Sequence, residues 1–391
     1  MAAPPLTDPI RALLEPPTLG DPAPTFHALR SRDPVHWNDG IESWVLTRHA
    51  DCLEVLKDNT RFGSDWRRAG EEVPAALLSI QSLDPPEHTG VRQLLVAAFR
   101  AASPGSLAET IERDAREILA GFGSTPFDFT GQVAEPLALR TITNLLGVPA
   151  PDLAWFRPIS AAVVDAMDAG LRPETHEPGL AARAELAALA DGWLADPPDL
   201  GGIVGYLVTG VGRLDRATVD RAVLDNSLRA VLHAGFESVS RLLSHSLVAL
   251  LDTPDGMARF RSADPHLAVD ELVRHTSPVQ ADARVCLADT TVGQATIHQG
   301  QAVTVLIGAA NRDPQRFADP DGLHLDRKPN PHLGFGRGAH ACVGSALAGL
   351  VARVLLGVLA HEHPDVHACD APIYRRNATL RGVERFDVCL T

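Results

Sequence analysis

Apolar residues recur at helical spacing over most of the middle of the chain. Between residues 84 and 252 they return every three or four positions, and Pro and Gly separate the successive runs. The longest run covers residues 219–251, far more than the ~11–12 residues of an average globular helix. This pattern predicts one long central helix with shorter helices packed around it.

Alternating apolar and polar residues predict strands near both ends of the chain. Residues 34–49 alternate around an Asn-Asp-Gly turn at residues 38–40, which is typical of a hairpin. After Ser277 the chain has β-type patterning with Gly at the turns, and short strands follow an apolar helix near the C-terminus. The proline-rich residues 1–25 are expected to lie as an extended arm on the body.

The order of these elements predicts a mainly α fold with a smaller β portion. Helical runs and strands follow one another without a repeat, a low-complexity stretch or a linker-like gap. We therefore expect a single domain over residues 1–391, a length that one large core can accommodate.

Composition and charge exclude several classes of protein. The formal net charge of −14 argues against a dedicated nucleic-acid binder, which would show a basic face. The N-terminus lacks the apolar run of a signal peptide, and no stretch has the length and purity expected of a membrane span. We therefore expect a cytoplasmic protein with neither a nucleic-acid nor a membrane partner. No CxxC pair occurs, so neither a disulfide framework nor a zinc ribbon is expected from the five cysteines, which are Cys52, Cys286, Cys342, Cys369 and Cys389.

The stretch HLGFGRGAHACVGSA, residues 332–346, combines four glycines with a single cysteine. Glycines allow a sharp turn and a close approach of the backbone to a flat ligand. Cys342 lies just before an apolar helix that begins near Ser345, where amide groups and the helix dipole favour a thiolate. A thiolate suits an axial position on heme iron. Two alternatives remain: a buried packing cysteine, and a nucleophile with His340 as its base, although i, i+2 neighbours are poorly placed for that role.

Residues 335–344, FGRGAHACVG, match the heme-binding signature FGxGxHxCxG of the cytochrome P450 family at every fixed position. The chain thus resembles a soluble bacterial cytochrome P450 over nearly its whole length. The resemblance implies the P450 fold, in which a large helical part surrounds heme b and a smaller part is β-rich. It also implies roles within the motif: Cys342 as the iron ligand, Phe335 packed near the sulfur, His340 bonded to a heme propionate, Gly336 and Gly338 at the turn, and Gly344 where the backbone approaches the sulfur.

A helix-spaced pair, Glu271 and Arg274, precedes Cys342 by about 70 residues with a β-rich segment between. The i, i+3 spacing puts both charges on one helix face, where they can form an ion pair. The pair resembles the ExxR motif of the family. We expect a structural role for it, completed by Arg327 and tying the helix to the loop before Cys342.

The sequence DPPEHTGVR, residues 84–92, starts a helix with two prolines and places His88 and Arg92 on one face. Two such groups can hold a carboxylate, and heme carries two propionates. The segment resembles helix C of the family, which implies propionate contacts for both residues, and Arg284 resembles another propionate-binding arginine. Without the cysteine motif, the pair would be interpreted as an exposed His/Arg pair.

The centre of the long helix carries a third resemblance. Ala230, Ala234, Glu237 and Ser238 share one face at helical spacing, and Ala234-Gly235 is a weak point in helix propensity, so something should need the room there. The segment resembles the AGxET signature of helix I, which implies Glu237 and Ser238 as an acid–alcohol pair for O–O cleavage. Serine replaces the usual threonine and lacks the methyl group that fixes the rotamer. The alternative is an acid on a solvated helix face.

The substrate is the least determined feature. Candidate contacts are His233, Ala230, Ala234, Trp66 and Gln280. His233 either hydrogen-bonds a polar or anionic substrate or is a core histidine bonded to a backbone carbonyl. The polar candidates suggest a functionalised natural-product intermediate, hence a role in secondary metabolism. The resemblance implies a pocket lined by residues 64–83, 160–185, 230–238, 277–284 and 374–383.

The resemblance also implies an activity and partners. The leading hypothesis is a heme-thiolate monooxygenase that hydroxylates its substrate with O2 and with NAD(P)H electrons delivered by a separate ferredoxin and ferredoxin reductase. Arg337, Arg100 and Arg353 are candidates for the docking patch. Oxidative coupling or desaturation, a peroxide-driven enzyme, a noncatalytic heme sensor and a carrier-protein-bound substrate are alternatives.

Overall fold

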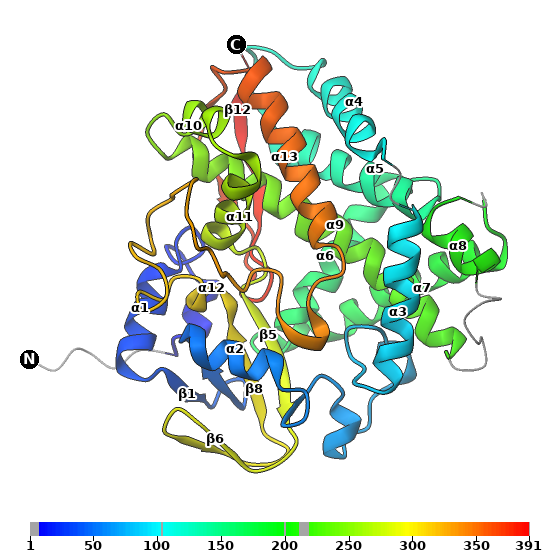
Figure 1. Cartoon of the computed structure of the whole chain (residues 1–391), viewed down its shortest axis with the longest axis vertical. Helices are drawn as coiled ribbons and strands as arrows, with labels where there is room; N and C mark the ends of the chain where they lie inside the picture. The colour runs from blue at the N-terminus through cyan, green and yellow to red at the C-terminus, as the bar shows by residue number, and fades with distance from the viewer. Residues whose placement is uncertain (1–7, 103–104, 199–200, 211–218, 391) are drawn as a thin grey trace, which may run out of the picture.

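The computed structural model describes residues 8–102, 105–198, 201–210 and 219–390. Helices make up most of the molecule, and strands β1, β5, β6 and β8 gather on one side of it (Figure 1). The predicted fold class, mainly α with a smaller β portion, is confirmed. The helices are α1 Ala23–Arg32, α2 His49–Lys57, α3 Glu87–Ala102, α4 Leu107–Leu119, α5 Glu135–Leu146, α6 Leu153–Asp165, α7 His176–Ala195, α8 Gly202–Gly210, α9 Arg221–Leu251, α10 Gly256–Ser262, α11 Pro265–Thr276, α12 Ile307–Ala310 and α13 Ser345–Glu362.

Helix α9 is the long central helix that the hydrophobic pattern predicts. Asp220 caps its first turn, where the carboxylate accepts a hydrogen bond from the amide of Ala222 at 2.9 Å. Most of its side chains are buried, and it packs against α5, α7, α11 and α13. These helices share one continuous apolar core, so packing rather than intrinsic propensity holds α9 in place.

A mixed sheet with strand order β1-β2-β8-β5-β3 packs its own apolar core beside the helices. The predicted hairpin is present, with β1 antiparallel to β2 and Asn38 paired with Ser43. Strand β2 then runs parallel to β8, which joins the N-terminal hairpin to the β-rich segment after α11. The strands are β1 Val35–Asn38, β2 Ser43–Leu46, β3 Phe62–Gly63, β4 Phe127–Asp128, β5 Ala281–Cys286, β6 Thr290–Val292, β7 Ala295–Ile297, β8 Ala302–Leu306, β9 His367–Ala368, β10 Ile373–Tyr374, β11 Val383–Arg385 and β12 Asp387–Cys389.

The N-terminal segment is less extended than its proline content suggests. Residues 1–7 of the expected arm lie outside the described residues. Beyond them, Arg11–Leu14 forms a short 3-10 helix, and Leu13 and Leu14 are buried in a cluster that includes Phe26 of α1. The apolar side chains of this segment therefore anchor it to the body through their burial.

Helix α13 corrects the expectation that no stretch is long and apolar enough for a membrane span. Its 18 residues have a mean hydropathy of 1.4, so by length and composition alone it could cross a membrane. Half of these residues are buried, and its apolar side chains belong to the main core between α4, α9, α10 and α11. Because a core helix passes the same test, this finding is weak evidence for a membrane.

Candidate active site

The loop before α13 folds into a tight turn that carries Cys342. Gly336 and Gly338 have φ values of +64° and +75°, a region that L side chains rarely adopt. A Cβ at Gly338 would also lie only 2.4 Å from the carbonyl oxygen of Leu56 in α2. The amide of Cys342 then donates to the carbonyl of Phe335 at 2.9 Å. The glycine-rich spacing therefore serves the turn and its close contact with α2.

The Cys342 thiol is solvent-accessible, although the protein around it raises its pKa by desolvation. The amides of Gly344 and Ser345 at the start of α13, and the guanidinium of Arg92, oppose that rise. The Cys342 sulfur is thus both accessible and partly desolvated. A Cβ at Gly344 would lie 3.9 Å from the sulfur, an ordinary contact, so sterics alone do not require glycine there.

Two imidazoles and a guanidinium gather beside the cysteine loop. The rings of His88 in α3 and His340 lie 4.3 Å apart, centre to centre. Arg92, one turn further along α3, donates from Nη2 to the carbonyl of Ala341 at 2.7 Å. Three of the predicted propionate contacts therefore lie together next to Cys342.

These residues fit the carboxylates of a heme. His88 is only 2% exposed, and within the described part of the chain its Nε2 has no hydrogen-bond partner. Burial lowers the pKa of His88 to about 4, and the neighbouring His340 and Arg92 act in the same direction. A buried polar nitrogen without a partner is unfavourable. A carboxylate placed between His88 and Arg92 would satisfy it.

Asp84 is a neighbour of His340 that the sequence did not single out. Nε2 of His340 lies 3.4 Å from Oδ1 of Asp84, and Nη1 of Arg68 donates to its Oδ2 at 2.9 Å. Burial alone would raise the pKa of Asp84, but bonds from His340, Arg68 and two backbone amides hold it well below its ordinary value. In this structure His340 thus faces a carboxylate of the protein, and its propionate role stays a prediction.

Arg284 is placed differently from the other predicted propionate residues. It is buried in β5, forms an ion pair with Asp282 at 2.8 Å, and donates to the carbonyl of Ala283 at 2.7 Å. Within the described residues these are its polar contacts, and they do not connect Arg284 to His88, Arg92 or His340. Its role toward a propionate also stays a prediction.

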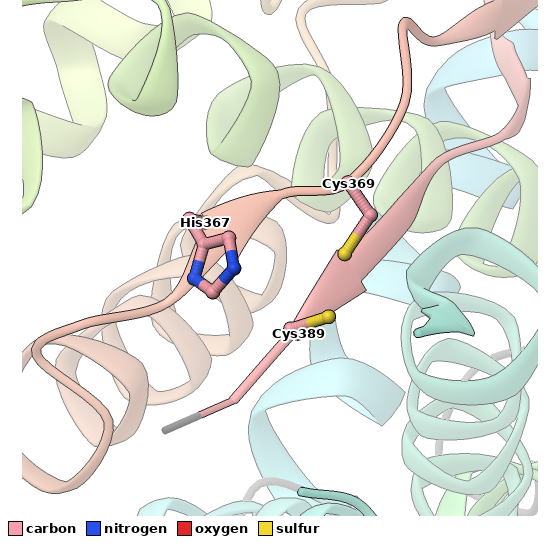
Figure 2. Close-up of side chains that lie close together, drawn as sticks. All are labelled: His367, Cys369 and Cys389. Carbon is pink, nitrogen blue, oxygen red and sulfur yellow. The ribbon is translucent and has the colours of Figure 1, made fainter. Parts of the chain in front are cut away.

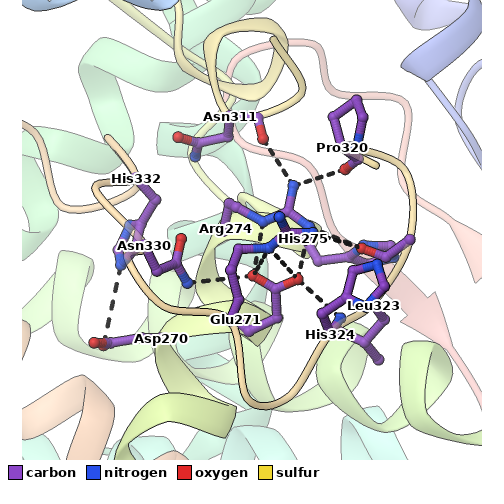
Figure 3. A network of polar contacts seen from close by, with 12 residues as sticks. Asp270, Glu271, Arg274, His275, Asn311, Pro320, Leu323, His324, Asn330 and His332 are labelled. Carbon is purple, nitrogen blue, oxygen red and sulfur yellow. Dashed lines mark hydrogen bonds and ion pairs between the residues drawn. The ribbon is translucent and has the colours of Figure 1, made fainter. Parts of the chain in front are cut away.

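Glu271 and Arg274 lie at the centre of one buried polar network (Figure 3). Arg327 joins this network through an ion pair with Glu271. Glu271 and Arg274 are both 0% exposed and form two hydrogen bonds of 2.7 and 2.8 Å. Nε of Arg327 donates to both carboxylate oxygens of Glu271 at 3.0 Å, and Nδ2 of Asn330 donates to Oε2 of Glu271 at 3.2 Å. The remaining N–H groups of Arg274 donate to backbone carbonyls of the segment that leads toward the cysteine loop, namely those of Asn311, Pro320 and Gly322.

On α9, only a narrow part of the central face is accessible. Ala234, Gly235 and Ser238 are half-buried, whereas Glu237 beside them and Ala230 one turn earlier are buried. The hydroxyl of Ser238 donates to the carbonyl of Ala234 at 2.7 Å. The room at Gly235 is used by α5, because a Cβ there would lie 2.6 Å from Ile142. The room that the weak helix propensity predicts at Ala234-Gly235 is therefore taken partly by α5.

Glu237 forms a buried ion pair with Arg241 one turn further along α9. Nε of Arg241 donates to Oε2 of Glu237 at 2.9 Å, and its Nη1 donates to the carbonyl of Leu380 at 3.0 Å. Burial would raise the pKa of Glu237, but Arg241, His233 and Arg375 outweigh it and lower the pKa. The i, i+4 spacing of an acid and an arginine was a signal that could have revealed this pair. Within the described residues, the hydroxyl of Ser238 donates to Ala234 and not to Glu237.

Two of the proposed substrate contacts occupy core positions. His233 is buried, and its Nε2 lies 3.2 Å from the carbonyl of Ser160 in α6, so the core-histidine alternative is the one that the structure supports. Gln280 is buried and donates to the carbonyls of Ser277 and Thr276, away from the α9 face. Trp66 is half-buried in a short 3-10 helix that packs against β5.

The segments expected to line a pocket do meet in space. Asp168, after α6, accepts bonds from the amides of Ala378 and Thr379 at 2.8 and 2.9 Å. At the other end, the hydroxyl of Ser227 in α9 accepts a bond from the amide of Ile80 at 2.9 Å. Three of the five segments are thereby tied to one another or to α9 by hydrogen bonds that sequence spacing could not reveal.

The predicted docking arginines differ in their availability. Arg100 is exposed at the end of α3. Arg337 is half-buried and donates to the carbonyls of His332 and Gly336, so it helps to hold the cysteine loop. Burial lowers the pKa of Arg353, and Asp270 opposes that change.

Comparisons with known proteins agree with these features. Residues 266–362 match the family model described as Cytochrome P450. A beta-dihydromenaquinone-9 omega-hydroxylase from Mycobacterium tuberculosis is 31% identical over 96% of this chain and 78% of its own length. A vitamin D(3) 25-hydroxylase from Pseudonocardia autotrophica is 32% identical over 95% and 94%. Ligand-free CYP164A2 of Mycobacterium smegmatis, a solved structure, has a TM-score of 0.85 at 30% identity and covers 98% and 99% of the two chains.

Proposed function

The chain belongs to the cytochrome P450 family, and from that premise we propose that it hydroxylates a small to medium organic substrate that carries an anionic group. It is a cytochrome P450 monooxygenase with heme b as its cofactor and O2 as its co-substrate. Its electrons derive from NAD(P)H through redox partners. We further propose that residues 1–391 form a single domain in the cytoplasm.

The cysteine side supplies the residues that would hold the heme. When bound, heme supplies the iron at which O2 is activated for transfer of one oxygen atom to the substrate. In this proposal Cys342 binds that iron, and His88, Arg92 and His340 bind the carboxylates.

The α9 side supplies the groups that would handle protons. Ser238 keeps its own hydrogen in a bond to Ala234, so its oxygen can accept a hydrogen bond from a water or a substrate hydroxyl. Glu237 pairs with Arg241, which lowers the pKa of this carboxyl group and favours its ionised form. It can take up and return a proton only when Arg241 moves away, which makes Arg241 a positioning residue in this proposal.

The proposal of an anionic substrate rests on Arg229. This arginine lies on α9 one turn before His233, is 7% exposed, and within the described residues forms no ion pair. Its Nε has no partner there, and its only hydrogen bond is a long one of 3.5 Å from Nη2 to Ala76 in the segment 64–83. Burial lowers the pKa of Arg229 to about 10, with a further contribution from the nearby Arg183 of α7.

Arg183 of α7 is a second cation near Arg229, and its positive charge increases the need for an anionic partner at this place. Burial lowers the pKa of Arg183 as well, and α7 packs directly against α9. Burying an arginine without a carboxylate is unfavourable unless a ligand supplies the missing charge. A carboxylate or phosphate on the substrate would accept bonds from Arg229 and reduce its repulsion with Arg183. The buried guanidinium of Arg229, which has no ion pair among the described residues, is the single observation on which the substrate class rests.

The relatives support hydroxylation as the reaction. Two of them are named as a menaquinone omega-hydroxylase and a vitamin D(3) 25-hydroxylase. One solved relative at 26% identity, P450BioI, is a complex with a fatty acid carried by an acyl carrier protein. A carrier-bound substrate is therefore the alternative form of the anionic group. Oxidative coupling and desaturation remain alternatives for the reaction, and a natural-product intermediate in secondary metabolism remains the proposed class of substrate.

We propose a ferredoxin with its reductase as the source of electrons. Of the three candidate arginines, Arg100 is the one that is exposed. We therefore expect Arg100→Glu to lower the rate of reduction by ferredoxin, and more so at low salt, because exposed charges act mainly on association. An unchanged rate would remove Arg100 from the docking surface.

The iron ligand is tested with Cys342→Ser. The variant should lose the thiolate-type Soret band of the reduced CO complex, and Cys286→Ser, which removes a buried cysteine in β5, should retain it. A variant at Cys342 that keeps this band would contradict the assignment.

The substrate class is tested with pairs of acids and their methyl esters. Substrate-induced spectral shifts should report acids binding more tightly than their esters, and Arg229→Gln should weaken binding of the acid by ~10–100-fold while leaving the ester unchanged. Arg221→Gln is the matched control, since Arg221 is an exposed arginine on the same helix. Equal binding of acid and ester by the unmodified enzyme would reject an anionic substrate but leave the monooxygenase intact.

A further inference from the structure

A histidine and two cysteines lie together at the C-terminal strands, and none of the three has a role in the candidate active site. They are His367 in β9, Cys369 just after it and Cys389 in β12 (Figure 2). One ligand atom from each lies within 4.8 Å of the others. Among the described residues this is the group of His, Cys, Asp and Glu side chains compact enough to hold a metal ion.

We propose that His367, Cys369 and Cys389 form a binding site for a thiophilic metal ion, with Zn²⁺ as its preferred occupant. Two thiolates and an imidazole are ligands that Zn²⁺ favours over the oxygen-preferring Mg²⁺ and Ca²⁺. Binding would form two Zn–S bonds and one Zn–N bond, and the two thiol protons would pass to solvent. No electron is exchanged in this step.

The strand register explains why the three side chains converge. Strand β9 is antiparallel to β12, and Cys389 is paired directly with His367. His367 and Cys369 are two residues apart, so in an extended strand they point to the same face. The amide of Cys369 donates to the carbonyl of Asp387 at 2.8 Å, which continues the pairing by one more position. Three ligands from two paired strands therefore share one face of the sheet.

The spacing requires only a small adjustment to bind an ion. Two sulfurs at ~2.3 Å from a tetrahedral Zn²⁺ lie about 3.8 Å apart, and a sulfur and a nitrogen lie about 3.5 Å apart. The present separations of up to 4.8 Å exceed these values by about 1 Å, which side-chain rotation can supply.

The histidine is already oriented for this role. Its Nδ1 lies 3.0 Å from the carbonyl oxygen of Asp365, so Nδ1–H donates there and the lone pair of Nε2 is left for a metal. A backbone carbonyl that fixes the tautomer in this way is a common support for a histidine ligand. His367 is exposed, Cys369 is half-buried and Cys389 is buried, so an ion could enter from the solvent side and still be bound at depth.

The charges around the sulfurs also favour a cation. The carboxylates of Asp370 and Asp387 lie near the Cys369 sulfur and add negative charge there. Asp387 is engaged by Arg385 at 2.8 Å, so it acts through its charge rather than as a ready ligand. The fourth position of a tetrahedral ion would therefore be taken by water.

An ion at this site would fix the two ends of the segment from Cys369 to Cys389. That segment contains β10 and β11 and supplies the carbonyl of Leu380 that accepts from Arg241. Holding its ends together would restrict the segment's motion and so would stabilise the folded protein in proportion to ion binding. This role is independent of the substrate proposal above. It concerns Cys369 and Cys389 at the ends of the segment, whereas the substrate proposal rests on Arg229 in α9.

The test uses the heme-loaded, full-length enzyme reduced with a phosphine under nitrogen and dialysed against buffered Zn²⁺. Elemental analysis of the dialysed protein should give one zinc per heme iron. Cys369→Ser and His367→Ala should each weaken zinc binding by at least about tenfold, because each removes a ligand. Cys286→Ser and His298→Ala are the matched controls, a buried cysteine and an exposed histidine outside the cluster, and should bind zinc like the unmodified enzyme.

Cadmium-113 NMR provides a second readout that does not depend on activity. A bound Cd²⁺ should show the chemical shift of a two-thiolate site, and the shift should move to that of a one-thiolate site in Cys369→Ser. Sub-stoichiometric zinc in the unmodified enzyme would reject the proposal, as would undiminished zinc in both ligand variants. Recovery of Cys369 and Cys389 as a disulfide in freshly purified protein would also reject it in favour of a redox pair.

Discussion

Two buried glutamate–arginine pairs lie on helices of this protein, and their polar groups are satisfied to very different degrees. In α11, Glu271 receives bonds from Arg274, Arg327 and the amide of His324, and the remaining N–H groups of Arg274 end on backbone carbonyls. In α9, Glu237 has Arg241 as its main partner, and Nη2 of Arg241, although 2.8 Å from the carboxylate, makes no hydrogen bond of good geometry.

The difference separates a structural pair from one that can change partners. A fully bonded buried network is rigid, and any substitution leaves several groups unsatisfied at once. A pair with a free N–H group can rearrange at lower cost, and this one lies one residue from Ser238 on the accessible part of α9. We therefore assign the α11 pair to the fold and keep the α9 pair as the candidate for proton handling.

The largest expected effect follows from Glu271→Gln. Gln cannot neutralise the two arginines, and breaking a buried ion pair costs about 3–5 kcal/mol, so the free energy of unfolding should fall by that amount. Urea unfolding and the ratio of heme to protein would measure the loss. Glu112→Gln, which breaks an exposed pair with Arg116 on α4, should change neither. A stable, fully heme-loaded Glu271→Gln enzyme would end the distinction between the two pairs.

A smaller loss of stability is expected for Glu237→Gln, about 1–3 kcal/mol, because fewer groups lose partners. Turnover should fall while spectral shifts with substrate persist, and the solvent isotope effect on product formation should change. Adding Arg241→Met removes the unpaired charge and should restore much of the stability without restoring turnover. If the double variant also regains turnover, Glu237 acts only through packing.

The pH dependence of stability provides a third measurement on the same pair. Since the folded pKa of Glu237 lies below the ordinary value of 4.5, its contribution is complete above about pH 4.5. It is lost as the pH falls through the lower, folded pKa, where the carboxylate becomes protonated. Urea midpoints at pH 6 should therefore separate the unmodified enzyme from Glu237→Gln, and midpoints at pH 3 should bring the two closer. A separation that grows on acidification would contradict the assigned direction.

The smallest expected effect is that of Ser238→Thr. The added methyl group fixes the hydroxyl rotamer, so product formed per NAD(P)H consumed should rise, while stability should change by no more than about 0.5 kcal/mol. Ser240→Thr, two residues away on a buried part of α9, controls for the added methyl group itself. Unchanged coupling would mean that the proton path does not depend on the orientation of this hydroxyl.

Local sequence signals determined the cysteine side of this protein. Three of these signals span no more than one or two turns, so sequence spacing alone predicts how the side chains are arranged. They are the glycines before Cys342, the i, i+3 pair of Glu271 and Arg274, and the i, i+4 pair of His88 and Arg92. The helices, the hairpin and the order of the elements followed in the same way from hydrophobic periodicity. The resemblance to the family then supplied the heme and the reaction.

The partners of the remaining residues were decided by tertiary structure, because they come from distant segments. Asp84 meets His340 across 256 positions, and Arg241 meets the carbonyl of Leu380 across 139. His233 faces a carbonyl of α6 rather than a ligand, and no local pattern could distinguish the two. Likewise, the lack of an ion pair for Arg229 among the described residues and the meeting of His367 with Cys389 depend on which helices and strands pack together. Sequence spacing fixes which face of an element a side chain occupies, whereas packing alone decides what that face meets.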